Sequence, residues 1–142
     1  MNATLALMSK TPELPECLSV IICDEIYRDE VSKKLILVGV FNVIKAAAFP
    51  AKHPRMTVLF TLTNGQGTYD MSLSLEHAST GAAIAEIKGP LKLQNPLEIV
   101  DFNVELGGLQ FPEPGKYWVI VKIDGAIINQ RPFVVVQAEA SQ

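Results

Sequence analysis

Hydrophobic and polar positions alternate along several stretches of the chain, and short turn sequences separate these stretches. Met71, Leu73 and Leu75 alternate with two serines and a glutamate, and residues 101–106 alternate in the same manner. A period of two residues is typical of a β-strand with one buried face, because successive side chains point to opposite sides. The sequence contains no 3.6-residue period long enough to predict a helix.

Runs rich in Val, Ile, Leu and Phe predict about eight strands. Gly, Pro, Asn or Asp bound each run, and short strands at this spacing are typical of a sandwich or barrel. The runs are Leu18–Tyr27, Lys34–Lys45, Met56–Thr63, Thr68–His77, Ala82–Ile87, Leu97–Leu106, Lys116–Asp124 and Ala126–Gln137. The intervals between them leave no room for the helices of βαβ units, so we expect antiparallel sheets.

Turn sequences support these strand boundaries. Asp124-Gly125 predicts a two-residue hairpin of type I′, which needs positive φ at both central positions. Asn64-Gly65-Gln66-Gly67 fits a hairpin between the third and fourth predicted strands, and Ser79-Thr80-Gly81 fits another turn. The predicted sandwich domain covers residues 17–137, between an irregular segment over residues 1–16 and a tail over residues 138–142.

The segment Phe111–Tyr117 resembles the tyrosine corner of immunoglobulin-like and other Greek-key sandwiches. In those folds a Tyr near the start of a late strand hydrogen-bonds back to the preceding backbone. Here Pro114 and Gly115 would make the turn and Tyr117 would face the core, with Trp118 on the opposite face. The resemblance implies an all-β, antiparallel, immunoglobulin-like Greek-key β-sandwich. The Cys and Trp pattern of true immunoglobulin domains is absent.

A second resemblance covers about residues 20–137. Its motifs are Leu37-Val38-Gly39-Val40-Phe41-Asn42, Phe49-Pro50-Ala51-Lys52-His53-Pro54, Phe111-Pro112-Glu113-Pro114-Gly115-Lys116-Tyr117, Asp124-Gly125 and Arg131-Pro132. With these motifs the chain is similar to a family of small bacterial proteins labelled as a domain of unknown function. The resemblance implies an uncharacterised bacterial β-sandwich protein, and it supplies no catalytic or binding residues.

Composition narrows the classes of partner. Hydrophobic residues make up 49% of the 142 residues and charged residues 19%, below the usual share of about 25%. Either much of this chain is buried or some apolar surface serves a partner. The net charge is −3 and no Lys/Arg cluster occurs, so we expect neither nucleic-acid binding nor attachment to a membrane surface.

The cysteines and the hydropathy indicate a cytoplasmic, soluble protein. Cys17 and Cys23 are six residues apart, which spans about 20 Å in an extended strand and exceeds disulfide reach. Free thiols point to a reducing compartment. The first ten residues lack the pattern of a signal peptide, and no segment reaches the about 18 apolar residues of a membrane span.

Residues that could carry chemistry are few. His53 is interpreted as a loop histidine and His77 as a turn histidine near Ser79, because neither has metal-ligand spacing. The acidic residues within 24–30 are interpreted as the charges of a solvated hairpin rather than a calcium site. The sequence shows neither a nucleophile elbow nor a phosphate-binding loop. We therefore predict no catalytic residue, metal or cofactor.

Some strands carry apolar residues on both faces, although a sandwich buries only one face of each sheet. Trp118 and Ile120 lie opposite the Tyr117 face, and Ile36 and Val38 lie in a run that is apolar on both faces. Large exposed apolar patches are typical of interfaces. We predict these four residues as an interface with a protein partner or a second copy. Two alternatives remain open: an intramolecular lid formed by the N-terminal segment or by residues 45–54, and simple exposure.

The leading functional hypothesis is a non-catalytic binding or assembly module, which acts through a sheet face or the loops at one end of the sandwich. The alternative is a small-ligand or carbohydrate-binding domain that uses Trp118 or the predicted loop over residues 49–55. In that loop the candidate contacts are Phe49, His53 and Arg55. An enzyme of unassigned class is the third hypothesis.

Overall fold

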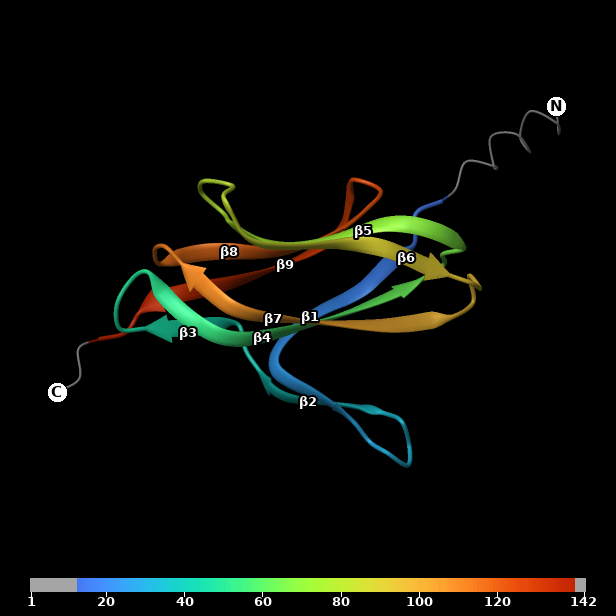
Figure 1. The fold of residues 1–142 in the computed structure, drawn as a ribbon, viewed down its shortest axis with the longest axis horizontal. Helices are drawn as coiled ribbons and strands as arrows, with labels where there is room; N and C mark the ends of the chain where they lie inside the picture. Colours follow the sequence, from blue (N-terminus) through green and yellow to red (C-terminus); the bar gives the residue numbers. More distant parts are fainter. Residues whose placement is uncertain (1–12, 140–142) are drawn as a thin grey trace.

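The computed structural model describes residues 13–139, in which all regular structure is β-strand. Two sheets lie face to face as the layers of a sandwich (Figure 1). The described strands are β1 Glu16–Arg28, β2 Leu35–Val40, β3 Val43–Ala46, β4 Ala51–Thr63, β5 Gly67–His77, β6 Ala83–Leu93, β7 Ile99–Phe111, β8 Gly115–Ile123 and β9 Ala126–Gln137. The predicted all-β sandwich is confirmed, with nine strands. Residues 1–12 and 140–142 of the expected terminal segments lie outside the described residues.

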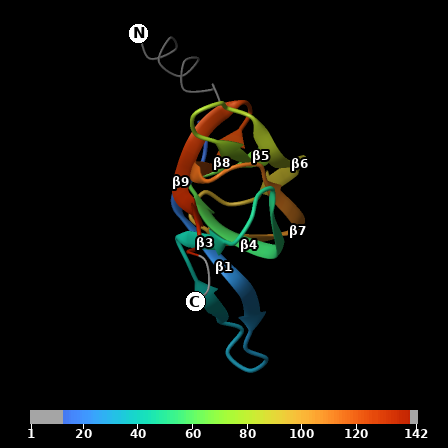
Figure 2. The ribbon, with the colours of Figure 1, turned by 90° about the vertical axis from the view of Figure 1, so that its left-hand side faces the viewer.

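The connectivity alternates between the two sheets. One sheet has the order β2-β1-β4-β7 and the other has the order β3-β9-β8-β5-β6. The chain changes sheet between β2 and β3, β3 and β4, β4 and β5, β6 and β7, and β7 and β8, as expected for a Greek-key sandwich. Neighbouring strands are antiparallel except for β3 and β9, which run parallel. Figure 2 shows the two layers from the side.

The predicted strand Lys34–Lys45 is wrong as a single element, because it forms β2 in one sheet and β3 in the other. The crossing falls at Asn42. Its backbone oxygen accepts a hydrogen bond from the N–H of Val134 at 2.9 Å, and its Oδ1 accepts one from Arg131 Nη2 at 2.6 Å. These contacts hold the chain against β9. The hydrophobic run contains no Gly-Pro or Asn-Gly turn that would mark the crossing.

The predicted hairpin at Asn64–Gly67 is also wrong, because β4 and β5 lie in different sheets. The segment is a connection between the layers. Tyr69 Oη accepts a hydrogen bond from the N–H of Gln66 at 2.9 Å. A methyl group at Gly65 would collide with Leu93 and approach Pro15 Cβ to 3.1 Å. The glycine therefore lies in close packing between the layers, which turn chemistry alone does not distinguish from a hairpin.

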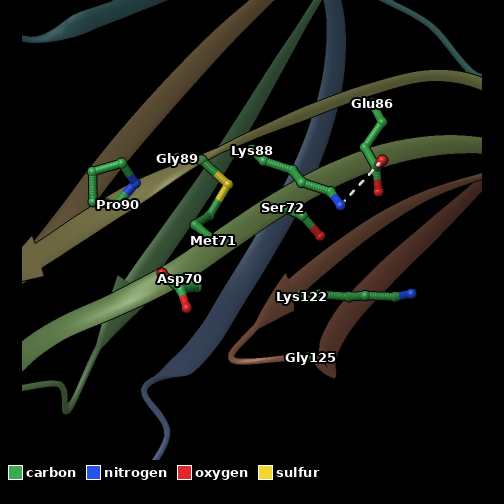
Figure 3. Close-up of a pocket in the computed structure, with 9 residues that line it drawn as sticks. All are labelled: Asp70, Met71, Ser72, Glu86, Lys88, Gly89, Pro90, Lys122 and Gly125. Carbon is green, nitrogen blue, oxygen red and sulfur yellow. Dashed lines mark ion pairs between the residues drawn. The ribbon is translucent and has the colours of Figure 1, made fainter.

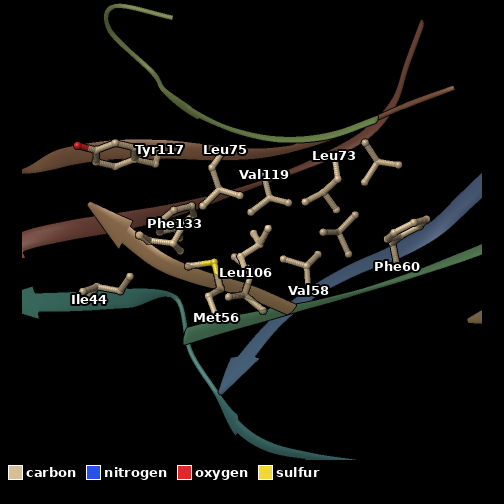
Figure 4. Packing of buried hydrophobic residues seen from close by; sticks show 14 of the residues in the cluster. Ile44, Met56, Val58, Phe60, Leu73, Leu75, Leu106, Tyr117, Val119 and Phe133 are labelled. Atoms are coloured by element: carbon tan, nitrogen blue, oxygen red, sulfur yellow. The ribbon is translucent and has the colours of Figure 1, made fainter. Parts of the chain in front are cut away.

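The core lies between the inner faces of the two sheets (Figure 4). Met56 and Val58 of β4 face Leu73 and Leu75 of β5, and all four side chains are fully buried. Complete burial of a side chain of this kind contributes about 1.5–3 kcal/mol. Three aromatic rings gather at one end of this core, where Phe111 and Tyr117 lie 5.0 Å apart and Tyr117 and Phe133 lie 5.7 Å apart.

The segment before β8 folds back on itself through one hydrogen bond. Pro114 and Gly115 lie at the turn, and Tyr117 Oη donates to the backbone oxygen of Glu113 at 2.5 Å. Tyr117 is fully buried. Trp118 is half-buried on the opposite face, as the two-residue period predicted.

The β8–β9 hairpin has the predicted turn. Asp124 has φ 50° and Gly125 has φ 83°, so both central residues adopt the positive φ of a type I′ turn. The Asp124 carboxylate also accepts a hydrogen bond from the backbone N–H of Asp70 at 2.8 Å, which ties the turn to β5. The hairpin predicted from Asp124-Gly125 is confirmed.

Polar side chains of β9 close the side of the sandwich next to β1. Asn129 Nδ2 donates a hydrogen bond to the backbone oxygen of Cys17 at 3.0 Å, and Arg131 Nη1 donates to that of Val20 at 3.2 Å. Hydrogen bonds from a charged donor are among the stronger ones in proteins. The two strands belong to different sheets, so these bonds join the layers.

The expectation of a cytoplasmic protein depended on free thiols and on hydropathy. Cys17 and Cys23 are both free, as predicted. Burial raises the pKa of each thiol above its ordinary value, because the charged thiolate loses solvation. Within residues 13–139, no helix is long and apolar enough to cross a membrane. The compartment stays a prediction.

Candidate functional site

The hairpin of residues 26–40 projects beyond the two layers of the sandwich (Figures 1 and 2). It consists of the end of β1, a turn and β2, and we call it the arm. Its exposed large apolar side chains are Tyr27, Val31, Ile36, Val38 and Val40. These are five of the twelve exposed large hydrophobic residues described for the chain. The arm therefore concentrates apolar surface where the core cannot cover it.

The register of the arm places three of these residues on one face. Ile36, Val38 and Val40 lie opposite Tyr27, Glu25 and Cys23 of β1, and successive residues of a strand alternate between faces. We call Ile36, Val38 and Val40 the β2 stripe. It continues the outer face of the four-stranded sheet, where Cys23 pairs with Thr57 of β4.

Among the strands of residues 13–139, β2 pairs only with β1, so its outer edge is open there. Its six residues include no charge and no proline, the devices that usually protect an edge strand from pairing with another chain. The N–H of Asp29 donates to Lys34 O at 2.9 Å. Because hydrogen-bonded pairs alternate along an antiparallel ladder, Leu35 and Leu37 direct their backbone groups toward the open edge.

Charged residues surround the base of the arm on its outer face. Arg55 of β4 forms an ion pair with Glu25 of β1, and its Nη1 lies 3.8 Å from Glu105 Oε1 of β7. Tyr27 Oη donates to Glu25 Oε2 at 2.5 Å. Together with Thr57 and neighbouring side chains, these groups line a hollow of about 340 Å³. Exposed ion pairs of this kind contribute about 0–1 kcal/mol each.

The opposite face of the arm carries an acidic group close to β2. The Asp24 carboxylate lies against Gly39, where a methyl group would collide with it. Asp24 and Gly39 also line a hollow of about 420 Å³ with Lys45 and His53. A carboxylate therefore lies beside the backbone of the edge strand.

The turn of the arm is organised around one aspartate. Asp29 Oδ2 accepts hydrogen bonds from the N–H groups of Ser32 at 2.6 Å and Val31 at 3.1 Å. The hydrogen bonds from Ser32 hold the pKa of Asp29 below its ordinary value. Lys33 and Lys34 follow directly, so the start of β2 is basic while Asp24 and Glu25 make its far end acidic.

Trp118 and Ile120, predicted to form an interface with Ile36 and Val38, lie in the other sheet. The structure does not bring the two pairs together. Ile120 is 6% exposed although it faces outward, because it lies between Ser74 and Gln130 of the flanking strands. Lys116 Nζ lies 4.5 Å from the centre of the Trp118 ring, a cation–π contact.

The predicted loop of Phe49, His53 and Arg55 is largely strand. β4 begins at Ala51, so only Phe49 remains in the connection, before a cis peptide bond to Pro50. His53 is half-buried, with its ring 5.8 Å from that of Phe41. Arg55 belongs to the charged base of the arm. The prolines suggested a loop, but β4 pairs with β7 across this segment.

A hollow of about 580 Å³ lies on the outer face of the five-stranded sheet (Figure 3). Met71, Ser72 and Lys122 line it together with residues of β6, where Lys88 Nζ lies 3.7 Å from Glu86 Oε1. The predicted strand Ala82–Ile87 stopped short of this part of β6. Proline within a strand favours the edge of a sheet. Gly89-Pro90 is therefore compatible with an edge strand that continues past Ile87, and the sequence prediction missed this signal.

His77 ends β5 beside the Ser79–Gly81 turn, as expected. Its Nδ1 accepts a hydrogen bond from the N–H of Ser79 at 3.2 Å and lies 2.9 Å from Ser79 Oγ, and its Nε2 lies 3.0 Å from Glu113 Oε1. A hydroxyl, an imidazole and a carboxylate in a row also occur in catalytic triads. Here Nδ1 of His77 already accepts a hydrogen bond from the backbone N–H of Ser79. We therefore interpret these three side chains as stabilising the turn. Within residues 13–139, no three His, Cys, Asp or Glu residues are grouped to hold a metal ion.

Comparison with known proteins supports a fold and a family. No curated protein matches the chain by sequence. The fold is similar to part of a solved structure of the Pseudomonas fluorescens alkylpurine DNA glycosylase AlkC, bound to DNA containing an abasic site analogue. At a TM-score of 0.54 and 14% sequence identity, the match covers 94% of this chain and 33% of that chain. The chain thus spans about a third of the glycosylase, and the likeness shows the fold alone. The sequence model of the family of unknown function DUF6941 matches residues 18–136, so the chain belongs to this family.

Proposed function

We propose that the protein is a non-catalytic binding or assembly module that acts through the arm. The observation that supports this most directly is the coincidence of the β2 stripe with an open strand edge. Apolar side chains gain about 25 cal/mol for each Å² removed from water. An open edge supplies backbone hydrogen bonds to an added strand. A partner strand would satisfy both requirements at the same place.

The Trp118 face is less favoured as the binding surface. Ile120 is already covered by its neighbours, and Lys116 lies over the Trp118 ring. A partner at this face would have to displace that lysine and would gain little apolar burial at Ile120. Ile36 and Val38 of the predicted interface therefore carry the proposal, and Trp118 and Ile120 do not.

Photo-crosslinking tests the role of the arm. A photoreactive benzoylphenylalanine replaces Val38 in one variant and the exposed Lys92 of β6 in a control, in cells that make the protein at its natural level. We expect a crosslinked protein adduct at Val38 and none at Lys92. Equal adducts at both positions, or none at Val38 while the variant is folded, would contradict the proposal.

Small-ligand or carbohydrate binding is the second candidate, and the hollow beside Ser72 favours it. The hollow combines the apolar ring of Pro90 with charged groups, a common composition of ligand sites. Screening on a glycan array would test it, with Ser72→Glu as the variant. Binding that Ser72→Glu abolishes would support this candidate, and the absence of binding by the wild type would exclude glycans.

A further inference from the structure

We propose that the partner of the arm is a second copy of this chain, whose β2 pairs antiparallel with β2 about a two-fold axis at Leu37. The inference rests on the proposed function and specifies its partner. The two four-stranded sheets would then form one continuous sheet of eight strands. A two-fold contact of this kind uses the same surface on both copies.

Two residues of the β2 stripe, Ile36 and Val38, are complementary to each other in this register. A two-fold axis perpendicular to the sheet keeps the outer face of one copy on the same side as that of the other. Pairing about Leu37 places Ile36 beside Val38 of the second copy, and Val38 beside Ile36 of the second copy. Apolar residues then meet apolar residues in both directions. A shift by one residue would bring residues of opposite faces together, which a strand pairing does not allow.

The backbone groups of the open edge fit the same register. Leu37 directs its N–H and C=O away from β1, so two copies of Leu37 can exchange both hydrogen bonds across the axis. The hydrogen bonds between β1 and β2 stay intact, because they use the backbone groups of Ile36 and Val38.

The charges favour the antiparallel orientation. Lys34 would lie opposite Val40 of the second copy, so the two Lys34 residues are separated by about 20 Å along the strands. A parallel pairing would instead place these lysines side by side. Antiparallel pairing also brings the Lys33 end of one copy near Asp24 of the other, whose carboxylate lies against Gly39. Unlike charges therefore meet at both ends.

The shape of the molecule permits this contact. The arm extends past the two layers (Figure 2), so its open edge is not covered by β3 or by the rest of the sandwich. An extended peptide of another protein could use the same edge. Such a peptide would need an apolar stripe and a basic N-terminal end. A second copy of β2 already has both.

Light scattering coupled to size-exclusion chromatography tests the pairing. We expect a mass about twice the 15.5 kDa of the chain. Val38→Glu places a charge in the stripe and should halve this mass. Val31→Glu is the matched control, since Val31 is 92% exposed at the turn outside the paired segment, and it should keep the doubled mass. A wild type that stays monomeric, or a Val38→Glu variant that stays dimeric, would overturn the proposal.

Cysteine crosslinking tests the register without relying on a destabilised variant. In a chain with Cys17→Ser and Cys23→Ala, Leu37→Cys should form an intermolecular disulfide on mild oxidation. Directly opposed hydrogen-bonded residues have Cα atoms about 5.5 Å apart, within disulfide range. Lys34→Cys should not crosslink. Equal crosslinking at both positions, or none at residue 37, would refute the register.

The photo-crosslinking experiment separates this proposal from the proposed function. An adduct at Val38 with the mass of two chains supports both. An adduct with a different protein supports a binding role of the arm and overturns the second copy as its partner. The absence of an adduct contradicts both.

Discussion

Arg131 of β9 donates a hydrogen bond from Nη2 to Oδ1 of Asn42, at 2.6 Å, at the point where the chain leaves the arm. Its Nη1 reaches Val20 of β1. One side chain thus joins β9, β1 and the root of the arm, which belong to different sheets. The root of the arm is therefore held by a polar contact in addition to β1, which continues from the core into the arm.

Replacing Arg131 should destabilise the fold. Arg131→Met keeps much of the apolar stem and removes both donors, and hydrogen bonds from charged groups contribute about 1.5–3 kcal/mol. We expect the free energy of unfolding, measured in urea, to fall by about that amount. The matched control is Arg28→Met, because the exposed Arg28 makes one hydrogen bond to Lys33 O; exposed substitutions change stability by about 0.5 kcal/mol or less. Equal effects of the two substitutions would contradict this account.

Tyr117→Phe tests the corner before β8. Removal of the hydroxyl that donates to Glu113 should lower the free energy of unfolding by about 0.5–1.5 kcal/mol at neutral pH. Circular dichroism during urea denaturation measures it. Because the ring stays in place, we expect no change of assembly state. An unchanged stability would show that the hydrogen bond to Glu113 contributes nothing.

The same residue predicts a pH dependence. Burial, with a smaller contribution from the Glu113 charge, raises the pKa of Tyr117 above its ordinary value of 10.0. The folded state therefore binds this proton more tightly than the unfolded state. The contribution of Tyr117 to stability is complete below pH 10.0 and is lost as the pH rises through the folded pKa. The stability difference between wild type and Tyr117→Phe should shrink above pH 10.0, and a constant difference would contradict the burial of the hydroxyl.

Gly65→Ala tests the connection between the layers. The added methyl group would collide with Leu93 and crowd Pro15, and overpacking of this kind costs about 1–3 kcal/mol. Thermal unfolding should show a lower midpoint. Gly89→Ala is the control, since a methyl group at Gly89 meets no atom within 4 Å. A Gly65→Ala variant as stable as Gly89→Ala would show that the connection is loosely packed.

The sequence predicted the strands better than their assignment to sheets. Alternation of the kind seen at Met71–Leu75 depends on local geometry, so it identifies β5 and the buried positions Leu73 and Leu75. The crossing at Asn42 depends instead on contacts with Arg131 and Val134, which lie about ninety residues further along the chain. Hydrophobic periodicity contains no information about such contacts.

The sequence predicted only part of the candidate surface, because exposure also depends on contacts between residues that are distant in the sequence. Two-sided apolar patterns identified β2 and β8 alike. The flanking residues Ser74 and Gln130 cover Ile120, whereas no third strand reaches Ile36 and Val38 within the described residues. Exposure depends on the neighbours of a strand, and those neighbours follow from the topology rather than from the strand's own residues.

Hydrogen exchange at the open edge tests the central claim most directly. The amides of Leu35 and Leu37 face away from β1 and meet no partner strand in the described part of one copy, whereas Ile36 and Val38 are bonded to β1. If the arm binds a second copy, the exchange of Leu35 and Leu37 should slow as the protein concentration rises, while Ile36 and Val38 change little. Exchange at Leu35 and Leu37 that stays fast and independent of concentration would contradict the account.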